Sequence, residues 1–277
     1  KAQEVALGSR AYAVSALEIL ANVLHSMSDK GLTESSLVKS REVKTTAILL
    51  VVSDKGLVGS FNSAVLRSLE KYTKEIGGKF IFVIVGQKGA DYITKRNGNI
   101  EKVFTNYSDV IAIEEVNELG DLLHKGFITG KWDRVVSFSM NFISALKQEV
   151  IVQNLLPLDV NHIRAAVEDI IPETGKYAEF KKEIRAGRQT KPIDYIIEPA
   201  PKTVVDELLP VLFRMQLYHL ILEANASEHS ARRVAMKNAT ENAGDIISNL
   251  TLQYNRSRQE AITKEIAEIT GTVAALK

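Results

Sequence analysis

The sequence predicts an α/β protein in which a sheet-containing domain lies between two helical segments, and we expect these segments to pair as an antiparallel two-helix coiled coil. Three observations support this fold class. Strand and helix patterns alternate through the middle of the chain, an apolar stripe runs through residues 1–27, and the last quarter has few helix-breaking residues. Of the 277 residues, 45% are hydrophobic and 25% are charged, which is typical of a folded protein.

The N-terminal segment, residues 1–27, has apolar side chains at spacings of three and four residues, as in a helix with one apolar stripe. Gly8 weakens this helix by about 1 kcal/mol relative to alanine, a cost that packing can offset. Residues 28–44 are polar and contain Asp29-Lys30-Gly31, which predicts a turn. Because the sequence starts at Lys1 within the helical pattern, we expect part of the N-terminus to be missing.

The middle of the chain, residues 45–198, predicts a mostly parallel sheet covered by helices on both faces, which is a Rossmann-like α/β domain. A tight turn near Ser144 joins the last two of four clear strand patterns, at 45–53, 79–85, 133–142 and 149–156. Helix patterns alternate with the strands, at 62–76, 87–96 and 113–127. A final strand is predicted at 193–197, and a loop or lid at 161–192.

The C-terminal segment, residues 202–277, predicts one long helix, because it contains only Pro210, Gly244 and Gly271 as breakers. A helix of about 70 residues is about 105 Å long, whereas a compact chain of this size has a radius of gyration of about 19 Å. The helix is therefore expected to extend beyond the α/β domain. Pro210 is expected to kink or restart it, because proline lacks a backbone N–H.

An apolar seam follows the end of this helix at spacings of four and three residues, the spacing of a coiled coil; its members are Ile262, Ile266, Ile269, Val273 and Leu276. The N-terminal segment, which covers only about 40 Å, is the other stripe in the chain. Missing upstream residues, another subunit or both are therefore expected to cover the rest of the seam.

Catalytic and cofactor sites are not supported by the motifs. The turn from Gly56 to Gly59 follows a strand but lacks the phosphate-binding glycine fingerprints, so we interpret it as structural, with Asp54 and Lys55 as solvated loop residues. The five histidines show no metal-ligand spacing, and we expect no metal and no cofactor. Absence of cysteine excludes disulfides and thiol catalysis. A net charge of +1 argues against nucleic-acid binding, and no apolar run is long enough to insert into a membrane.

Two functions remain open on the residues alone. One is an α/β nucleotide-binding enzyme with an oligomerising helix, which would bind ATP or NAD in isolation. The other is a coiled-coil adaptor, which would form a stable homodimer through the long seam.

Four segments resemble the gamma subunit of F-type ATP synthase. The strongest match is in the long helix, at 231–244 (ARRVAMKNATENAG) and 250–269 (LTLQYNRSRQEAITKEIAEI). The turn SDKGLVGSFN at 53–62 and the break Pro199-Ala-Pro201-Lys before the helix also match. The chains of that family begin earlier, with a basic helical stretch that this sequence lacks.

The resemblance implies a non-catalytic rotor in the central stalk, coupling proton flow through a membrane ring to ATP synthesis. The implied partners are the hexamer of alpha and beta subunits, the epsilon subunit and the c-ring, on the cytoplasmic face of a bacterial plasma membrane or the matrix side of the mitochondrial inner membrane. Contacts with loops of the catalytic subunits are implied for Arg258, Gln259, Thr263, Glu265 and Glu268. The apolar seam would form the bearing at the tip, and the foot near the ring would include Tyr218, Glu223 and Glu228.

Overall fold

The computed structural model describes residues 36–107, 111–144, 147–158 and 200–275. The chain divides into two compact units, the first ending at Ala231 and the second starting at Arg232. The predicted N-terminal helix, the loop or lid at 161–192 and the strand at 193–197 lie outside the described residues.

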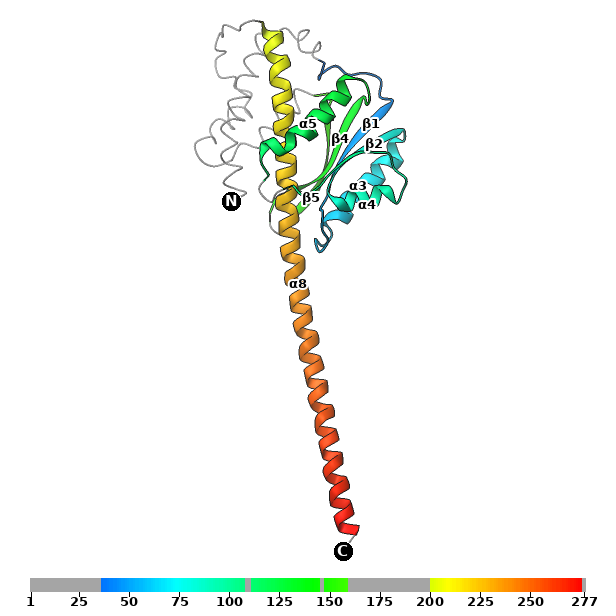
Figure 1. The fold of residues 1–277 in the computed structure, drawn as a ribbon, viewed down its shortest axis with the longest axis vertical. Helices are drawn as coiled ribbons and strands as arrows, with labels where there is room; N and C mark the ends of the chain where they lie inside the picture. The colour runs from blue at the N-terminus through cyan, green and yellow to red at the C-terminus, as the bar shows by residue number, and fades with distance from the viewer. Residues whose placement is uncertain (1–35, 108–110, 145–146, 159–199, 276–277) are drawn as a thin grey trace, which may run out of the picture. The chain divides into compact units, whose positions relative to one another are not determined.

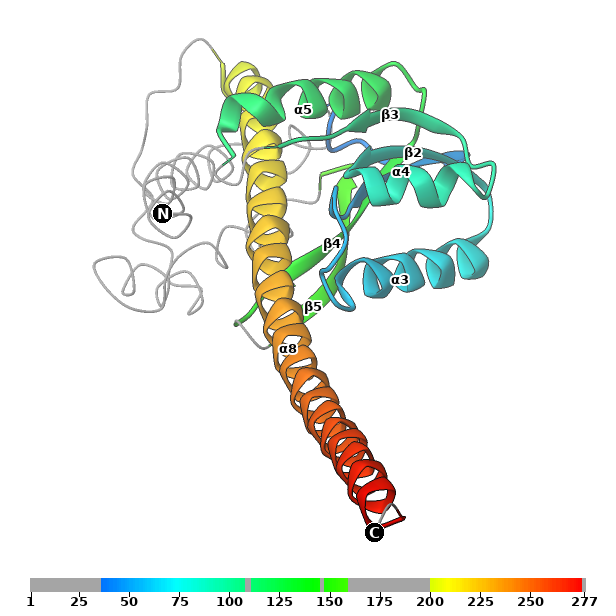
Figure 2. The same cartoon turned by 60° about the horizontal axis from the view of Figure 1, so that its bottom comes forward.

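A five-stranded sheet forms the centre of the first unit, in the order β3-β2-β1-β4-β5 (Figures 1 and 2). Its strands are β1 (Thr45–Val51), β2 (Lys79–Val85), β3 (Ile100–Phe104), β4 (Arg134–Phe142) and β5 (Gln148–Leu156). The first four strands run parallel to their neighbours, and β5 pairs antiparallel with β4. The predicted parallel sheet and its closing hairpin are therefore confirmed.

Strand β3 corrects the sequence prediction, which assigned no strand to Ile100–Phe104. The segment is short, and Glu101 and Lys102 separate its apolar residues. Only Phe104 of this strand is buried, because β3 lies at the edge of the described sheet and pairs only with β2. An edge strand needs little apolar surface, so its sequence pattern is weak.

Helices cover both faces of the sheet (Figure 2). On one face lie α3 (Phe61–Ile76) and α4 (Gln87–Thr94), and on the other lie α5 (Ile113–Ile128) and the first part of α8 (Pro201–Ala275). Side chains alternate along a strand, so Ile48 and Leu50 of β1 pack on the α3 side, while Leu49 and Val51 pack toward α5 and α8. This two-sided burial explains why β1 is a continuous apolar run.

Helix α8 is uninterrupted from Pro201 to Ala275, so it does not restart at Pro210. The residues after the proline belong to the core of the first unit: Leu209 and Ile221 are fully buried, and Phe213 is 1% exposed. Buried positions between 209 and 227 occur around the whole circumference of the helix, which is typical of a helix enclosed by its own domain. The first compact unit therefore includes the start of α8.

Candidate partner-binding surface

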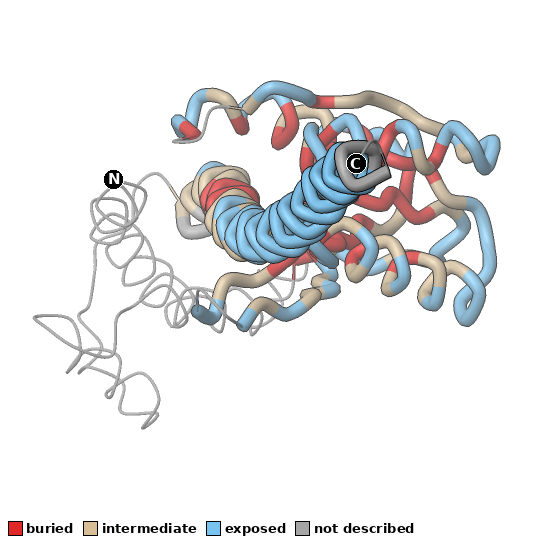
Figure 3. Tube along the Cα trace, turned by 90° about the horizontal axis from the view of Figure 1, so that it is seen from below, coloured by how far each residue is buried: buried red, intermediate tan, exposed pale blue. Residues whose placement is uncertain are grey.

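The second part of α8 is exposed along its whole circumference. Every described residue from Met236 to Gly271 is exposed (Figure 3). Large apolar side chains lie among them: Ile246, Ile247, Leu250, Leu252, Tyr254, Ile262, Ile266 and Ile269. So many exposed large apolar side chains on one helix are typical of a site of protein–protein interaction.

The predicted bearing residues lie at the end of this exposed stretch. Ile262, Ile266 and Ile269 are 48%, 57% and 62% exposed, so these side chains are accessible to a partner. Val273 lies within α8, but its side chain is not described, and Leu276 lies outside the described residues. Since α8 is continuous here, the spacing of four and three residues places the three isoleucines along one side of the helix.

The predicted polar contacts flank the apolar seam. Helical spacing places Arg258 and Glu265 on one edge of the seam, and Gln259 and Thr263 on the other edge. The Thr263 hydroxyl donates a hydrogen bond to the Gln259 carbonyl over 2.8 Å, and Glu268 lies 4.0 Å from the Lys264 ammonium. All five polar residues are exposed, so this part of α8 presents an apolar strip between polar margins.

The predicted foot residues lie in the first unit and differ in exposure. Tyr218 is only 4% exposed and belongs to the core, and burial, followed by the nearby Glu114 charge, raises the pKa of its hydroxyl. Glu223 is exposed and Glu228 is half-buried. Of the three, the two glutamates therefore offer surface to a partner.

The turn after β1 is held together by its own side chains. The Ser53 N–H donates to the Asn62 side-chain oxygen over 3.0 Å, and the Asn62 amide donates to the Ser53 hydroxyl over 2.7 Å. Asp54 accepts hydrogen bonds from the backbone N–H groups of Gln87 at 2.9 Å and Asn106 at 2.8 Å. Asp54 is therefore a half-buried loop residue with a structural role, because its carboxylate joins the turn after β1 to the start of α4 and to the connection after β3.

This arrangement bears on the nucleotide-binding hypothesis. Gln87 is the first residue of α4, and the amino end of a helix is where a nucleotide phosphate would bind. The Asp54 carboxylate already accepts the N–H group at that position. An internal anion therefore occupies the amino end of α4, which disfavours a phosphate at that helix; the turn from Gly56 to Gly59, to which the hypothesis applied, precedes α3 instead.

The described histidines do not converge on a metal site. Within the described ranges, no group of three or more histidines and carboxylates could hold a metal ion. His124 of α5 is half-buried, and burial, assisted by the charge of Arg214 in α8, lowers its pKa despite the opposing charge of Asp121. His25 and His162 lie outside the described residues.

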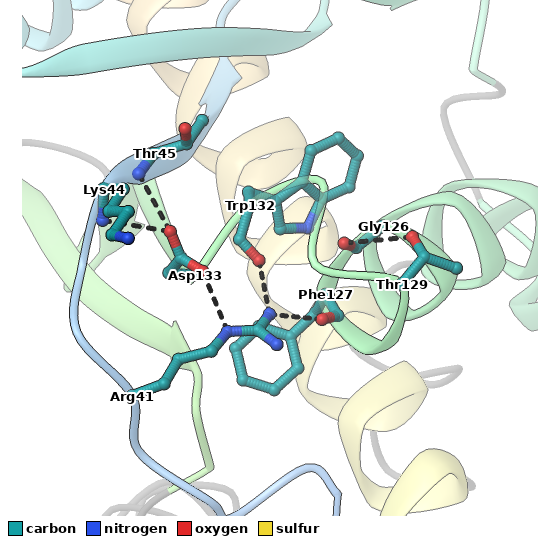
Figure 4. Close-up of polar contacts among 8 residues, drawn as sticks. All are labelled: Arg41, Lys44, Thr45, Gly126, Phe127, Thr129, Trp132 and Asp133. Carbon is teal, nitrogen blue, oxygen red and sulfur yellow. Dashed lines mark hydrogen bonds and ion pairs between the residues drawn. The ribbon is translucent and has the colours of Figure 1, made fainter.

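A cluster that the sequence did not reveal lies where the connection into β1 meets the end of α5 (Figure 4). The Arg41 guanidinium donates to the carbonyl of Phe127 and, over 2.7 Å, to that of Trp132. Its Nε lies 2.9 Å from a carboxylate oxygen of Asp133. These partners are distant in sequence, so no spacing rule could have predicted them.

Asp133 connects this cluster to the start of strand β1. Its second carboxylate oxygen accepts hydrogen bonds from the N–H groups of Lys44 and Thr45, both over 3.0 Å. Burial alone would raise the pKa of the Asp133 carboxyl, but these two hydrogen bonds and the charge of Arg41 outweigh it and hold the pKa below its ordinary value. Asp133 is therefore a carboxylate at neutral pH.

Comparison with known proteins identifies a family over the whole chain. The family model described as ATP synthase matches residues 1–276. The chain is 35% identical to the ATP synthase gamma chain of Nostoc sp. over 285 aligned residues, covering all of this chain and 89% of the relative. The gamma chain of Gloeothece citriformis is 33% identical over the full length of this chain and 90% of its own.

Solved structures share the fold. The rotor of the Euglena gracilis mitochondrial ATP synthase matches with a TM-score of 0.56 at 16% identity, covering 94% of this chain and 97% of that one. A second structure of that synthase, with its OSCP, F1 and c-ring parts, gives a TM-score of 0.59 at 19% identity, covering 99% and 93% of the two chains. These likenesses concern the fold, and the family assignment rests on sequence.

Proposed function

The chain belongs to the ATP synthase gamma family, and from this premise we propose that it is the non-catalytic rotor of the central stalk, coupling proton flow through the membrane ring to ATP synthesis. The exposed stretch of α8 from Met236 to Gly271 is the observation that supports this role most directly. A helix that leaves both apolar and polar side chains exposed over such a length is built to be surrounded by partners.

The partners follow from the same premise. The alpha and beta subunits would surround the exposed part of α8, with Ile262, Ile266 and Ile269 as the bearing. Arg258, Gln259, Thr263, Glu265 and Glu268 would face loops of the catalytic subunits. The c-ring and the epsilon subunit would bind at the foot, where Glu223 and Glu228 offer surface.

Pairing of the N-terminal segment with α8 is the remaining element of the proposal. Residues 1–27 carry an apolar stripe, and the exposed seam of α8 has the matching spacing. An antiparallel coiled coil of the two segments would cover part of that seam. The resulting domains would be the N-terminal helix at 1–27, the α/β domain at 45–198 and the long helix at 202–277.

Energetics require that torque is shared among many contacts. Moving one charge through 100 mV releases about 2.3 kcal/mol, whereas one exposed ion pair contributes at most about 1 kcal/mol. An asymmetric shaft would press each catalytic site differently and so shift its population between open and closed states, because differential contact is what shifts such an equilibrium.

We place the protein at the periphery of a membrane, held there by the ring. Among the described residues, no helix is sufficiently long and apolar to cross a bilayer. The cytoplasmic face of a bacterial plasma membrane is the location we favour, since cyanobacterial gamma chains are among its relatives. The matrix side of the mitochondrial inner membrane is the alternative.

Reconstitution tests this proposal. The full chain, co-expressed with alpha and beta subunits and assembled in vesicles with the complete membrane and stator parts of a synthase, should co-purify with the hexamer and support ATP-driven proton uptake. A chain that ends at residue 235 keeps the first unit but lacks the exposed stretch, and it should abolish uptake. Failure of the full chain to co-purify, or equal uptake by the shortened chain, would contradict the proposed function.

A further inference from the structure

The connection leading into the α/β domain, residues 36–44, has no helix or strand, yet it is fixed to the domain at two points. The first point is Leu37, which is 2% exposed, lies in the core and accepts a hydrogen bond from the Leu158 N–H over 2.7 Å. The second point is the cluster around Arg41 (Figure 4).

Arg41 is well suited to hold a helix end. Phe127 is in the last turn of α5, where the helix dipole favours a positive charge, and its carbonyl accepts the Arg41 guanidinium in addition to the Gly130 N–H. The planar guanidinium reaches two carbonyl groups and a carboxylate at once, and its carbon lies 4.6 Å above the centre of the Phe127 ring. A lysine could not make all of these contacts.

The turn that receives Arg41 is itself well packed. Trp132 is fully buried, and its indole N–H donates to the Leu123 carbonyl over 3.1 Å. A methyl group at Gly126 would lie 1.9 Å from the Trp132 ring, so the indole rests directly on the backbone of α5. Arg41 therefore binds to a surface that leaves little room for movement.

We propose that Arg41 is a positioning residue of the rotor, which fastens the connection from the N-terminal segment to the end of α5 so that this segment turns together with the α/β domain. The inference rests on the proposed function and on the pairing of residues 1–27 with α8. It assigns to Arg41, together with the anchor at Leu37, the task of making an irregular connection rigid under torsion.

The mechanical consequence follows from two parallel attachments. Helix α8 is joined to the α/β domain through the core of the first unit, and the N-terminal segment is joined through residues 28–44, of which 36–44 are described and fixed to the domain. A free connection of the length of residues 36–44 could extend to about 30 Å and would transmit no twist. Two helices that carry torsion in parallel add their stiffness, so freeing one of them completely would remove up to half of it. Loss of Arg41 alone leaves the anchor at Leu37 and removes less than half.

Rotation of single complexes measures this stiffness. The complex is immobilised through its hexamer, and a bead is attached through Lys71→Cys, an exposed site on α3 in a chain that has no other cysteine. The angular variance of the bead during catalytic pauses is inversely proportional to torsional stiffness. Arg41→Ala should raise the variance by less than a doubling, because Leu37 still anchors the connection, and Arg41→Lys, which keeps the charge opposite Asp133, should raise it less than Arg41→Ala.

Arg96→Ala is the matched control. Arg96 also combines an ion pair, 2.7 Å from Glu70, with a cation–π contact, 3.7 Å from the Tyr92 ring, but it joins α3 and α4 on the other face of the sheet. Arg96→Ala should leave the angular variance unchanged, because a loss of local stability elsewhere in the domain does not lower the torsional stiffness of residues 36–44.

The outcomes separate the inference from the proposed function. If the unsubstituted chain neither assembles nor rotates, the proposed function fails. If it rotates and the variance is the same with Arg41→Ala, only the inference fails. If the Arg41→Ala protein does not assemble, the comparison is made between Arg41→Lys and Arg96→Ala. A larger angular variance with Arg41→Lys supports the inference, and an equal angular variance overturns it.

Discussion

At the scale of single residues, Asp133 shows how one carboxylate can organise a junction. It pairs with Arg41 and accepts the N–H groups of Lys44 and Thr45. Asp133→Asn removes the charge and leaves the guanidinium without its counterion, so we expect the free energy of unfolding to fall by about 1–3 kcal/mol. Denaturant unfolding of the full chain at neutral pH would measure this loss.

The pH dependence of that loss is a separate prediction. Because the folded state lowers the pKa of Asp133, its contribution to stability is present above the ordinary aspartate pKa and is lost as the pH falls through the folded value. The difference in unfolding free energy between the unsubstituted chain and Asp133→Asn should therefore shrink at acid pH. A difference that stays constant down to acid pH would show that the charge is not responsible.

Arg258 and Gln259 lie on opposite margins of the apolar seam, and both are exposed. If they contact loops of the catalytic subunits, Arg258→Ala combined with Gln259→Ala should lower coupled ATP turnover by up to about tenfold, as expected for a combined loss of about 1.4 kcal/mol. Arg256→Ala is the control, since Arg256 pairs within the helix with Glu260 at 3.1 Å. Equal turnover in all three proteins would remove the assignment of these two positions.

At the scale of elements, the sequence predicted best where one residue pattern decides the structure. The strand at 79–85 is observed as predicted, and the helix at 113–127 differs by one residue at its end. The edge strand β3 was missed because its weak pattern results from pairing with a single neighbour. The junction of Arg41 and the contact of Asp54 with α4 could not be predicted, because both join segments that only the folded chain brings together.

The end of α5 provides a stability prediction at this scale. A side chain at Gly126 would overlap the Trp132 ring, with a Cβ atom 1.9 Å from the indole. Gly126→Ala should lower the unfolding free energy by about 1–3 kcal/mol, the usual cost of overpacking a core. Gly244→Ala is the matched control: its Cβ would meet nothing, so it should stabilise α8 by up to about 1 kcal/mol. Thermal unfolding of both variants would compare the effects, and an unchanged Gly126→Ala protein would contradict this packing.

At the scale of the whole molecule, the exposed part of α8 raises the question of what covers it. A coiled-coil adaptor would satisfy the seam with a second copy of itself, whereas a rotor would satisfy it with other chains. We expect the isolated full chain to sediment as a monomer, or to associate without a defined size, and to bind a hexamer of alpha and beta subunits. Sedimentation at increasing concentration, with and without the hexamer, distinguishes these cases, and a stable homodimer that does not bind the hexamer would favour the adaptor.

The apolar residues near the end of α8 are expected to contribute much of the affinity for that hexamer. Ile262, Ile266 and Ile269 are about half exposed or more in the chain alone, and complete burial of an isoleucine is worth about 1.5–3 kcal/mol. Replacing all three by serine should therefore weaken binding of the hexamer by orders of magnitude, while the α/β domain, which contains none of them, keeps its thermal stability. Removal of residues 274–277 should have a much smaller effect, because the last turn of a helix frays and contributes little. If the triple variant bound the hexamer as well as the unsubstituted chain does, the apolar seam would not be the bearing.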